Sequence, residues 1–271
     1  MEGDVSVVVP AYNEEDSIED TLYHLEELSD YESIDEVYLM DDHSEDNTRE
    51  IITDYLEDHD SDVKVSCMRE NGNKVGAIEE AIKLIDSEKI VLTDADTRLK
   101  TPEKLSEAAE KMDEEEYGGL AFKVAPDDSG EDIRDDIYNR VQDFDYAMGR
   151  ALAAFTTGEK LRRDPEDKNV RCVAGAGGMY ETDKLEKALE HHSGEHAGDD
   201  METTAIMQLI LDEDIDYEKE VEFETEVPKE FDELLSQRTR WSRGAIQSFS
   251  NHPKEHLSEM KSFSRYGMTT T

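Results

Sequence analysis

Short apolar runs alternate along this chain with longer segments in which apolar residues recur every three or four positions. The first half contains the runs Val5–Val9, Ile34–Met40, Val63–Cys67 and Ile90–Leu92. Runs of this length predict buried strands, and the periodic segments between them predict amphipathic helices. Regular alternation of strand and helix indicates an α/β fold, in which helices flank a mostly parallel central sheet through right-handed crossovers.

The pattern is less regular in the second half. It predicts a helix after Pro102, a strand over 117–124, a long helix over 133–155, a charged loop over 158–169, a short strand over 170–173, a helix over 201–211, an edge strand over 215–227 and a helix over 231–249. Pro, Asp and Gly interrupt the pattern at 125–131. We therefore expect one domain with two halves, 1–125 and 126–250, followed by a tail over 251–271.

The charge balance narrows the possible partners. The chain has 71 acidic and 29 basic residues, a net charge of −42, with only 36% hydrophobic residues. Such a composition is also typical of disorder, but the regular apolar pattern argues against that. The acidic residues are dispersed, as expected for a protein of a high-salt organism, because the Debye length is only about 3 Å at 1 M salt. The charge predicts no nucleic-acid partner, since binding phosphate backbones requires basic surface.

Cysteine usage and hydropathy bear on localisation. Cys67 and Cys172 lack the spacing of a metal site, and we interpret them as buried thiols rather than a disulfide. The N-terminus does not resemble a secretion signal, and no apolar stretch is long enough to cross a bilayer. These features predict a cytoplasmic protein, or one at the cytoplasmic face of the membrane.

Asp94-Ala95-Asp96 directly follows the predicted strand 90–92. Ligands of parallel sheets bind at the carboxyl ends of the strands. Alternate residues of an extended chain point the same way, so both carboxylates can converge. Two hard oxygen ligands suit Mg²⁺ or Mn²⁺. Alone, this pattern is a weak signal in so acidic a chain, but Asn13, Asp42 and Lys74 follow other strands and should lie at the same edge.

Two common phosphate-binding motifs are missing. No Gly-x-Gly-x-x-Gly follows the first strand, and no Gly-x-x-x-x-Gly-Lys-Ser/Thr occurs in the chain. A dinucleotide-binding fold and a P-loop are therefore not expected.

Asp199 and Asp200 precede the helix predicted over 201–211. Carboxylates here could merely stabilise the helix dipole, or one could be a general base open to a substrate hydroxyl. His191, His192 and His196 nearby suggest zinc, which we consider the weaker interpretation. The glycine-rich stretch 174–178 either lets a ligand approach the backbone or forms a tight bend, and the sequence leaves both open.

Arginines concentrate in the last predicted helix. Arg238, Arg240 and Arg243 lie within six residues, and Gln237, Arg240 and the only tryptophan, Trp241, share one helical face. Arginine matches the geometry of phosphate oxygens, and an aromatic ring can carry a sugar. The alternative is a solvated basic face beside a core tryptophan.

These motifs, in this order, resemble the family-2 glycosyltransferases with the GT-A fold, most closely the processive hyaluronan, chitin and cellulose synthases. The segments that carry the resemblance are Val5–Glu14, Asp41–Thr48, Asn71–Ala77 (with Asn73 where glycine is usual), Asp94–Asp96, Gly198–Asp200 and Gln237–Trp241.

The resemblance implies a role for each motif. The first half would bind the nucleotide sugar and the second the acceptor. The donor site would comprise Pro10, Ala11, Tyr12, Asn13, Glu14, Asp42 (on the base), Lys74, Asp94 and, on the diphosphate, Gln237, Arg238 and Arg240. Asp96, with Asp94, would hold the metal, and Asp200 would be the catalytic base. Gly177, Asp199 and Trp241 would contact the acceptor.

The resemblance also implies an activity. It predicts inverting, Mg²⁺- or Mn²⁺-dependent transfer of a hexose or N-acetylhexosamine from a nucleotide sugar, by family likeness a UDP-sugar, to a glycan or lipid-linked acceptor. The synthases carry membrane helices that this sequence lacks, so membrane association would need a missing C-terminal region, and processivity stays open. The alternatives are a non-processive transferase that decorates a glycan, a nucleotide-sugar pyrophosphorylase, whose Gly- and Arg-rich loop is absent, and an inactive binding module.

Overall fold

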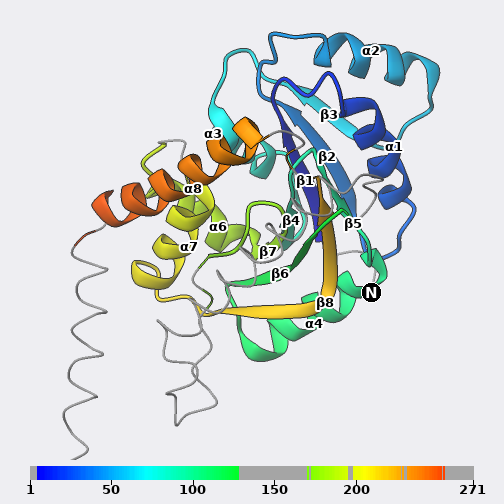
Figure 1. Ribbon diagram of the computed structural model, residues 1–271. Helices are drawn as coiled ribbons and strands as arrows, with labels where there is room; N and C mark the ends of the chain where they lie inside the picture. The colour runs from blue at the N-terminus through cyan, green and yellow to red at the C-terminus, as the bar shows by residue number, and fades with distance from the viewer. Residues whose placement is uncertain are drawn as a thin grey trace, which may run out of the picture.

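The computed structural model describes residues 5–127, 170, 172–194, 198–226, 228, 231–251 and 253. Within these residues the strands form one eight-stranded sheet with the order β3-β2-β1-β4-β7-β6-β8-β5 (Figure 1). The strands are β1 (Val5–Ala11), β2 (Glu36–Asp41), β3 (Lys64–Cys67), β4 (Lys89–Leu92), β5 (Thr97–Leu99), β6 (Gly119–Pro126), β7 (Gly178–Glu181) and β8 (Ile215–Thr225). The helices are α1 (Ile18–Ser29), α2 (Thr48–Asp58), α3 (Asn73–Ile82), the 3₁₀ turn η1 (Pro102–Lys104), α4 (Leu105–Glu115), α6 (Thr182–Glu190), α7 (Asp199–Leu209) and α8 (Phe231–Asn251).

The pairing confirms a mostly parallel α/β sheet. β1 lies between β2 and β4 and is parallel to both, and β3 continues this parallel part. β7 pairs antiparallel with β4 and β6, which joins the parallel part to the rest of the sheet. β6 and β8 are parallel over a long register that reaches Pro126 opposite Thr225. One continuous sheet therefore contains strands from both sides of residue 125.

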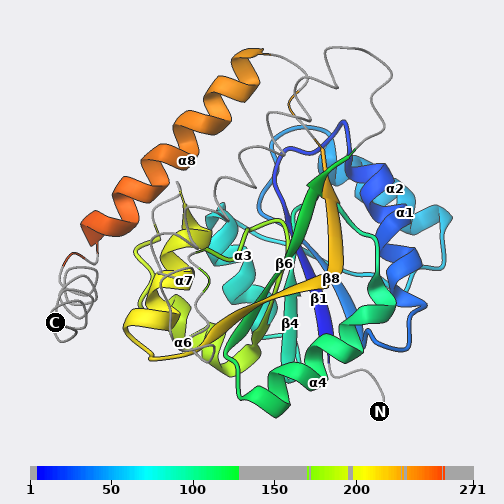
Figure 2. The ribbon, with the colours of Figure 1, turned by 60° about the horizontal axis from the view of Figure 1, so that its bottom comes forward.

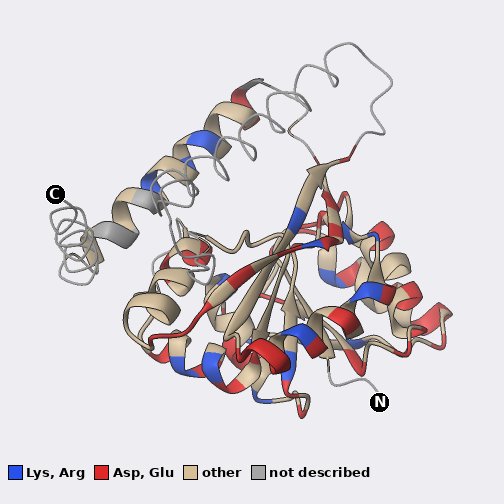
Figure 3. Ribbon diagram, turned by 90° about the horizontal axis from the view of Figure 1, so that it is seen from below, with Lys and Arg blue, Asp and Glu red and all other residues tan. Residues whose placement is uncertain are grey.

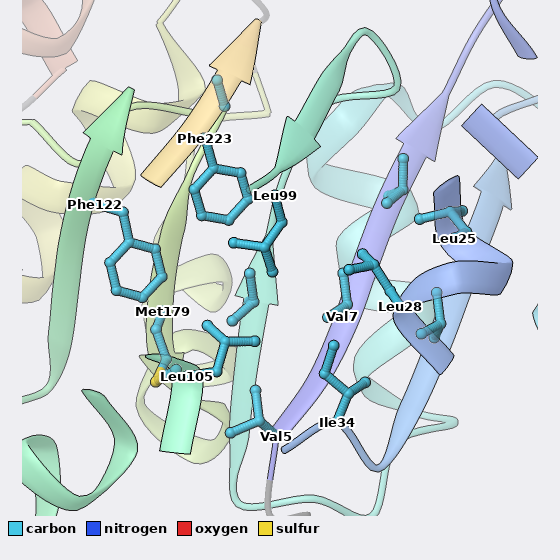
Figure 4. Close-up of a cluster of buried hydrophobic side chains, with 14 of the residues drawn as sticks. Val5, Val7, Leu25, Leu28, Ile34, Leu99, Leu105, Phe122, Met179 and Phe223 are labelled. Atoms are coloured by element: carbon cyan, nitrogen blue, oxygen red, sulfur yellow. The ribbon is translucent and has the colours of Figure 1, made fainter. Parts of the chain in front are cut away.

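Helices cover both faces of the sheet. On one face α1, α2 and α4 bury a core that includes Leu25, Leu28, Leu105 and Met112 (Figures 2 and 4). On the other face α3, α6 and α7 enclose a second core around Ile78, with Leu185 and Ile206. The three- and four-residue spacing of these apolar positions is what commits each helix to one face. None of the helices in these ranges is both long and apolar enough to span a bilayer.

Two predictions about strands were wrong. The segment 215–227 was expected at an edge, but β8 lies between β6 and β5, and the short strand β5 was not predicted. The strand expected at 170–173 is not formed by its described residues, and β7 starts at Gly178 instead. A Cβ at Gly178 would lie 2.1 Å from Cγ1 of Val173, so the chain turns back on itself there and Val173 packs against the strand.

Two helices begin earlier than their apolar stripes indicated. α3 starts at Asn73 and α7 at Asp199, so Lys74 and Asp200 both lie in first helical turns. Polar first turns carry no hydrophobic periodicity, which is why the pattern missed them. The long helix predicted over 133–155 and the loop over 158–169 lie outside the described residues.

Candidate functional site

The loops after β1 and β2 are locked together by side chains. Pro10 and Ala11 end β1, and Tyr12 follows with its side chain exposed. Asn13 has a φ of 58°, a left-handed conformation that asparagine tolerates. Its N–H donates to Ser44 Oγ at 2.9 Å, and its Oδ1 accepts from the N–H of Glu45 at 2.8 Å. Asn13 therefore shapes the rim of the site, and direct contact with a nucleotide stays a prediction.

Asp42 is a buried carboxylate at the end of β2, with 3% of its surface exposed. Its Oδ1 accepts from the N–H of Gly72 at 2.6 Å, and its carbonyl accepts from the Asn71 side chain at 3.1 Å. Burial raises the pKa of Asp42, and the bond from Gly72 opposes this effect. The loop before α3 thus holds Asp42 in place, with a carboxylate that can accept a second donor.

Lys74 connects the start of α3 to two other segments. Its Nζ contacts Asp94 Oδ1 and donates to the carbonyl of Gly175 at 3.2 Å. Burial alone would lower the pKa of Lys74, but Asp94, Asp199 and Asp200 together raise it above its usual value. Lys74 is therefore a fixed cation among carboxylates that come from different parts of the chain.

Glu14, Asp94 and Asp96 lie close enough to repel one another. Asp96 is exposed at the rim, yet desolvation of its carboxyl and then the charge of Asp94 raise its pKa to about 6. Burial raises the pKa of Glu14 to about 6 as well, and Asp96 and Asp94 add to the rise. Adding a cation would relieve this repulsion, and hard oxygen ligands fit Mg²⁺ or Mn²⁺.

This donor set suits a metal shared with a ligand. In the parts of the chain that the structure covers, no three His, Cys, Asp or Glu side chains form a metal-binding group. Mg²⁺ is usually held by one or two carboxylates together with phosphate oxygens of the substrate. Asp94 and Asp96 fit that arrangement, and Glu14 is close enough to add charge.

Asp200 lies in the first turn of α7 and faces the same region. Its Oδ1 accepts from the N–H of Met201 at 2.8 Å, and its Oδ2 accepts from the N–H of Gly175 at 3.3 Å. Burial, followed by the charge of Asp199, raises the pKa of Asp200. A carboxylate with a raised pKa is a stronger base, as general base catalysis requires.

Gly175 is the residue at which Lys74 and Asp200 meet. A Cβ on Gly175 would lie 2.8 Å from Lys74 Nζ and 3.7 Å from Asp200 Cβ. Gly177, by contrast, is buried, and a Cβ there would lie 2.9 Å from the ring of Phe223. The stretch forms a turn, because the N–H of Gly177 donates to the carbonyl of Ala174 at 3.0 Å. The approach of a ligand to the backbone at Gly175 stays a prediction. A contact of Gly177 with an acceptor stays a prediction.

A small pocket opens beside these residues. It is lined by polar or charged groups of Lys74, Gly175, Asp199, Asp200 and Thr203 and by Val75, Ile78, Leu92, Ala174, Tyr180, Leu185 and Leu189. Asp199, predicted at the acceptor side, therefore shares a pocket with Lys74 and Asp200. The interpretation of both cysteines as buried thiols is wrong for Cys67, which is exposed, and sequence reasoning did not anticipate that Cys172 lies near Asp200. Burial raises the pKa of the Cys172 thiol, and the nearby Asp200 adds to the rise. A lone cysteine gives no sequence signal of such a position.

Helix α8 packs against the start of α7. A Cβ on Gly198 would lie only 2.6 Å from the Cα of Gly244, so the two backbones touch. Figures 1 and 2 show α8 on the side of the molecule that carries α3, α6 and α7. Helix α8 therefore contacts the start of the helix that carries Asp200, and a cleft shared by Asp200 and Trp241 stays a prediction.

The basic face of α8 is organised around Trp241. The guanidinium carbon of Arg238 lies 4.7 Å from the centre of the Trp241 ring, and Arg238 Nη1 donates to Gln237 Oε1 at 3.1 Å. Trp241 is 37% exposed, which disfavours the core tryptophan interpretation, and Arg240 is exposed as well. Figure 3 shows Arg and Lys along α8, and Asp and Glu spread over the other helices and strands. Contacts of Gln237, Arg238 and Arg240 with a diphosphate stay predictions.

The histidine cluster does not come together as a zinc site in what the structure describes. The side chain of His192 is buried and contacts Glu202 and the carbonyl of Asp199, and His196 lies outside the described residues.

Comparison with known proteins gives both a family and a fold. The model of the family described as glycosyl transferase family 2 matches residues 6–189. Poly-beta-1,6-N-acetyl-D-glucosamine synthase of Staphylococcus epidermidis is 36% identical over 93 residues, which are 34% of this chain and 22% of the synthase. Dolichyl-phosphate beta-glucosyltransferase of Mus musculus is 35% identical over 106 residues, which are 36% of this chain and 33% of that enzyme. The matches therefore span about a fifth to a third of these relatives.

Solved structures share the GT-A architecture. The mannosyltransferase PcManGT from Pyrobaculum calidifontis, in complex with GDP-Man and Mn²⁺, has a TM-score of 0.69 at 20% identity, covering 94% of this chain and 65% of that one. Glucosyl-3-phosphoglycerate synthase from Mycobacterium tuberculosis, with Mn²⁺, UDP and phosphoglyceric acid, has a TM-score of 0.57 at 17% identity, covering 90% and 78%. At such identities the likeness concerns the fold.

Proposed function

Because this chain belongs to glycosyltransferase family 2, we propose that it transfers a hexosyl or N-acetylhexosaminyl group from a nucleotide sugar to a hydroxyl of a glycan or lipid-linked acceptor, with inversion and with a divalent cation. The observation that carries the proposal is the meeting of Lys74, Asp94 and Asp200 around Gly175. These side chains come from three motifs far apart in the sequence, and they would act as a fixed cation, a metal ligand and a base.

The donor would bind at the carboxyl ends of β1, β2 and β4. Asp42 would accept an N–H of the nucleobase, and Asp94 and Asp96 would hold Mg²⁺ or Mn²⁺. When bound, the cation would neutralise charge on the diphosphate. Lys74 would add a fixed positive charge, and Arg238 and Arg240 would bind phosphate oxygens from the other side. UDP is the preferred nucleotide from the family resemblance, and GDP is the alternative suggested by PcManGT.

Asp200 would remove the proton of the acceptor hydroxyl as the oxygen attacks the anomeric carbon. The bond from that carbon to the diphosphate breaks on the opposite face, and the nucleoside diphosphate leaves with the bonding pair. A single displacement inverts the anomeric configuration and needs one catalytic carboxylate. The raised pKa of Asp200 makes it a better proton acceptor, provided that the reaction pH lies above that pKa.

The class of acceptor is proposed from the relatives. A synthase of an N-acetylglucosamine polymer and dolichyl-phosphate glucosyltransferases support a polymer or a lipid-linked acceptor. A location at the cytoplasmic face of the membrane is proposed from the family resemblance alone. The second candidate is an inactive nucleotide-sugar-binding module. The coexistence of Asp200 and the Asp94–Asp96 pair favours the enzyme.

Release of nucleoside diphosphate from UDP- and GDP-sugars, measured in high KCl with Mg²⁺, Mn²⁺ or a chelator, tests the proposal. Metal-dependent release that rises with a glycan or lipid phosphate acceptor supports it. Asp200→Asn should abolish transfer but keep donor binding, whereas Asp54→Asn, at an exposed position of α2, should be fully active. Donor binding without turnover across the panel would favour the binding module.

A further inference from the structure

A buried polar cluster lies behind Asp199 and Asp200 and has no part in the chemistry above. Its centre is the carboxylate of Glu202 in the first turn of α7, with a side chain 3% exposed. The side chain of His192 beside it is 1% exposed. Burying a carboxylate costs free energy unless several hydrogen-bond donors surround it. The segments that supply these donors are therefore the ones that the cluster connects.

The donors come from two segments outside α7. The N–H of Ser193, in the loop between α6 and α7, donates to Glu202 Oε1 at 3.2 Å, and its hydroxyl donates to Oε2 at 2.7 Å. Nδ2 of Asn251, at the end of α8, lies 3.4 Å from both carboxylate oxygens and donates to Ser193 Oγ at 3.1 Å. Glu202 thus joins the loop and the end of α8 to α7.

His192 extends the cluster to the backbone of Asp199. The N–H of Gly194 donates to His192 Nδ1 at 3.0 Å, from which we assign the neutral ring its proton on Nε2. Nε2 lies 3.3 Å from the carbonyl of Asp199 and 3.7 Å from Glu202 Oε2. The same cluster therefore restrains the segment that leads into Asp200.

Helix α8 is attached to α7 at two points on one face. Gly244 touches Gly198, and Asn251 reaches Glu202 seven residues later. Positions seven apart lie on the same side of a helix, two turns or roughly 10 Å apart. Gln237 lies seven residues before Gly244 on that face. The contacts of Gly244 and Asn251 with α7 therefore fix the position of Gln237 and its neighbour Arg238 relative to Asp200.

We propose that Glu202 is a positioning residue that holds Asn251 at the end of α8 and residues 192–193 after α6 against α7, and so sets the arginine and tryptophan face of α8 against the catalytic base. The catalytic consequence rests on the proposed function, but the clamp itself does not. A role limited to stabilising the helix dipole, which a first-turn carboxylate also offers, would make no use of Asn251.

Trp241 allows a direct test, because it is the only tryptophan of the chain and lies on α8. The variants are Glu202→Gln and Asn251→Ala. The control is Ser250→Ala, whose hydroxyl donates within α8 to the carbonyl of Ile246. Acrylamide quenching and the emission maximum of Trp241 report the position of α8 without any substrate. Far-UV circular dichroism establishes that each variant is folded, and Asn251, being exposed, is the variant that should fold in any case.

Both variants should increase quenching and red-shift the emission relative to Ser250→Ala. Because small misplacements of catalytic groups cost up to about a hundredfold, kcat/KM should fall by roughly ten- to a hundredfold in both. Folded variants with the quenching and turnover of Ser250→Ala would overturn the proposal. Altered quenching in a protein that turns over no donor would support the clamp while the proposed function fails. Altered quenching with unchanged turnover would overturn the catalytic part.

Discussion

Gly175→Ala should separate activity from stability. The new Cβ would lie 2.8 Å from Lys74 Nζ, whereas ordinary contacts begin near 3.4 Å. Among the described glycines, positive φ occurs at Gly194 and Gly198, so the backbone at Gly175 accepts alanine. The atom that must move is the end of a flexible side chain, and the free energy of unfolding should therefore change by less than about 1 kcal/mol.

The displaced atom, Lys74 Nζ, is nevertheless the positive charge that connects Asp94 with Gly175 in the proposed site. Lys74 Nζ would have to retreat by several tenths of an ångström from the position where it contacts Asp94 and the Gly175 carbonyl. Hydrogen bonds to charged groups contribute about 1.5–3 kcal/mol. A largely lost bond would thus lower donor affinity or kcat/KM by roughly ten- to a hundredfold, since about 1.4 kcal/mol corresponds to a factor of ten.

The assay is nucleoside diphosphate release together with donor titration and thermal unfolding. Gly76→Ala is the matched control, because it lies on the same helix as Lys74 and its Cβ would meet Met68 at an ordinary 4.0 Å. It should be as active as the parent and slightly more stable, since alanine is favoured in helices. Equal activity of Gly175→Ala and Gly76→Ala would refute the assigned role of Lys74.

Four further predictions follow from other parts of the structure. Gly198→Ala should lower the free energy of unfolding by about 1–3 kcal/mol more than Gly194→Ala does. Both glycines have positive φ, but only a Cβ at Gly198 would clash with the backbone of Gly244. Equal losses in thermal unfolding would contradict the α7–α8 contact. Mn²⁺ affinity, measured by calorimetry, should fall as the pH drops below about 6, since Asp96 and Glu14 have pKa values of about 6 and bind a cation only when deprotonated. Because these pKa values are raised, the metal-free folded protein binds more protons than the unfolded chain between about pH 4 and 6. The free energy of unfolding should therefore fall as the pH rises through this range, and Asp96→Asn should reduce that loss. Stability against urea should rise with KCl, because screening reduces the repulsion within a chain of net charge −42, and full stability at low salt would contradict a high-salt origin.

Much of the fold could be predicted from periodicity alone. The runs that became β1 to β4 and the stripes of α1, α2 and α3 are patterns of local geometry, because a strand repeats every two residues and a helix every 3.6. The position of Asp94 and Asp96 after a buried strand was likewise visible without coordinates. The local sequence predicts these strands and helices because each one depends on which residues of a single segment face water and which face the core.

The tertiary structure decided the relations between segments. No pattern in the sequence predicted that β8 would lie inside the sheet. Nor did any pattern predict that Gly175 would lie between Lys74 and Asp200, or that Gly177 would pack against Phe223. Nor could spacing connect Asn251 with Glu202, which are 49 residues apart. Such contacts depend on how the sheet twists and how helices cross, and these are set by packing of the whole chain rather than by the residues on either side.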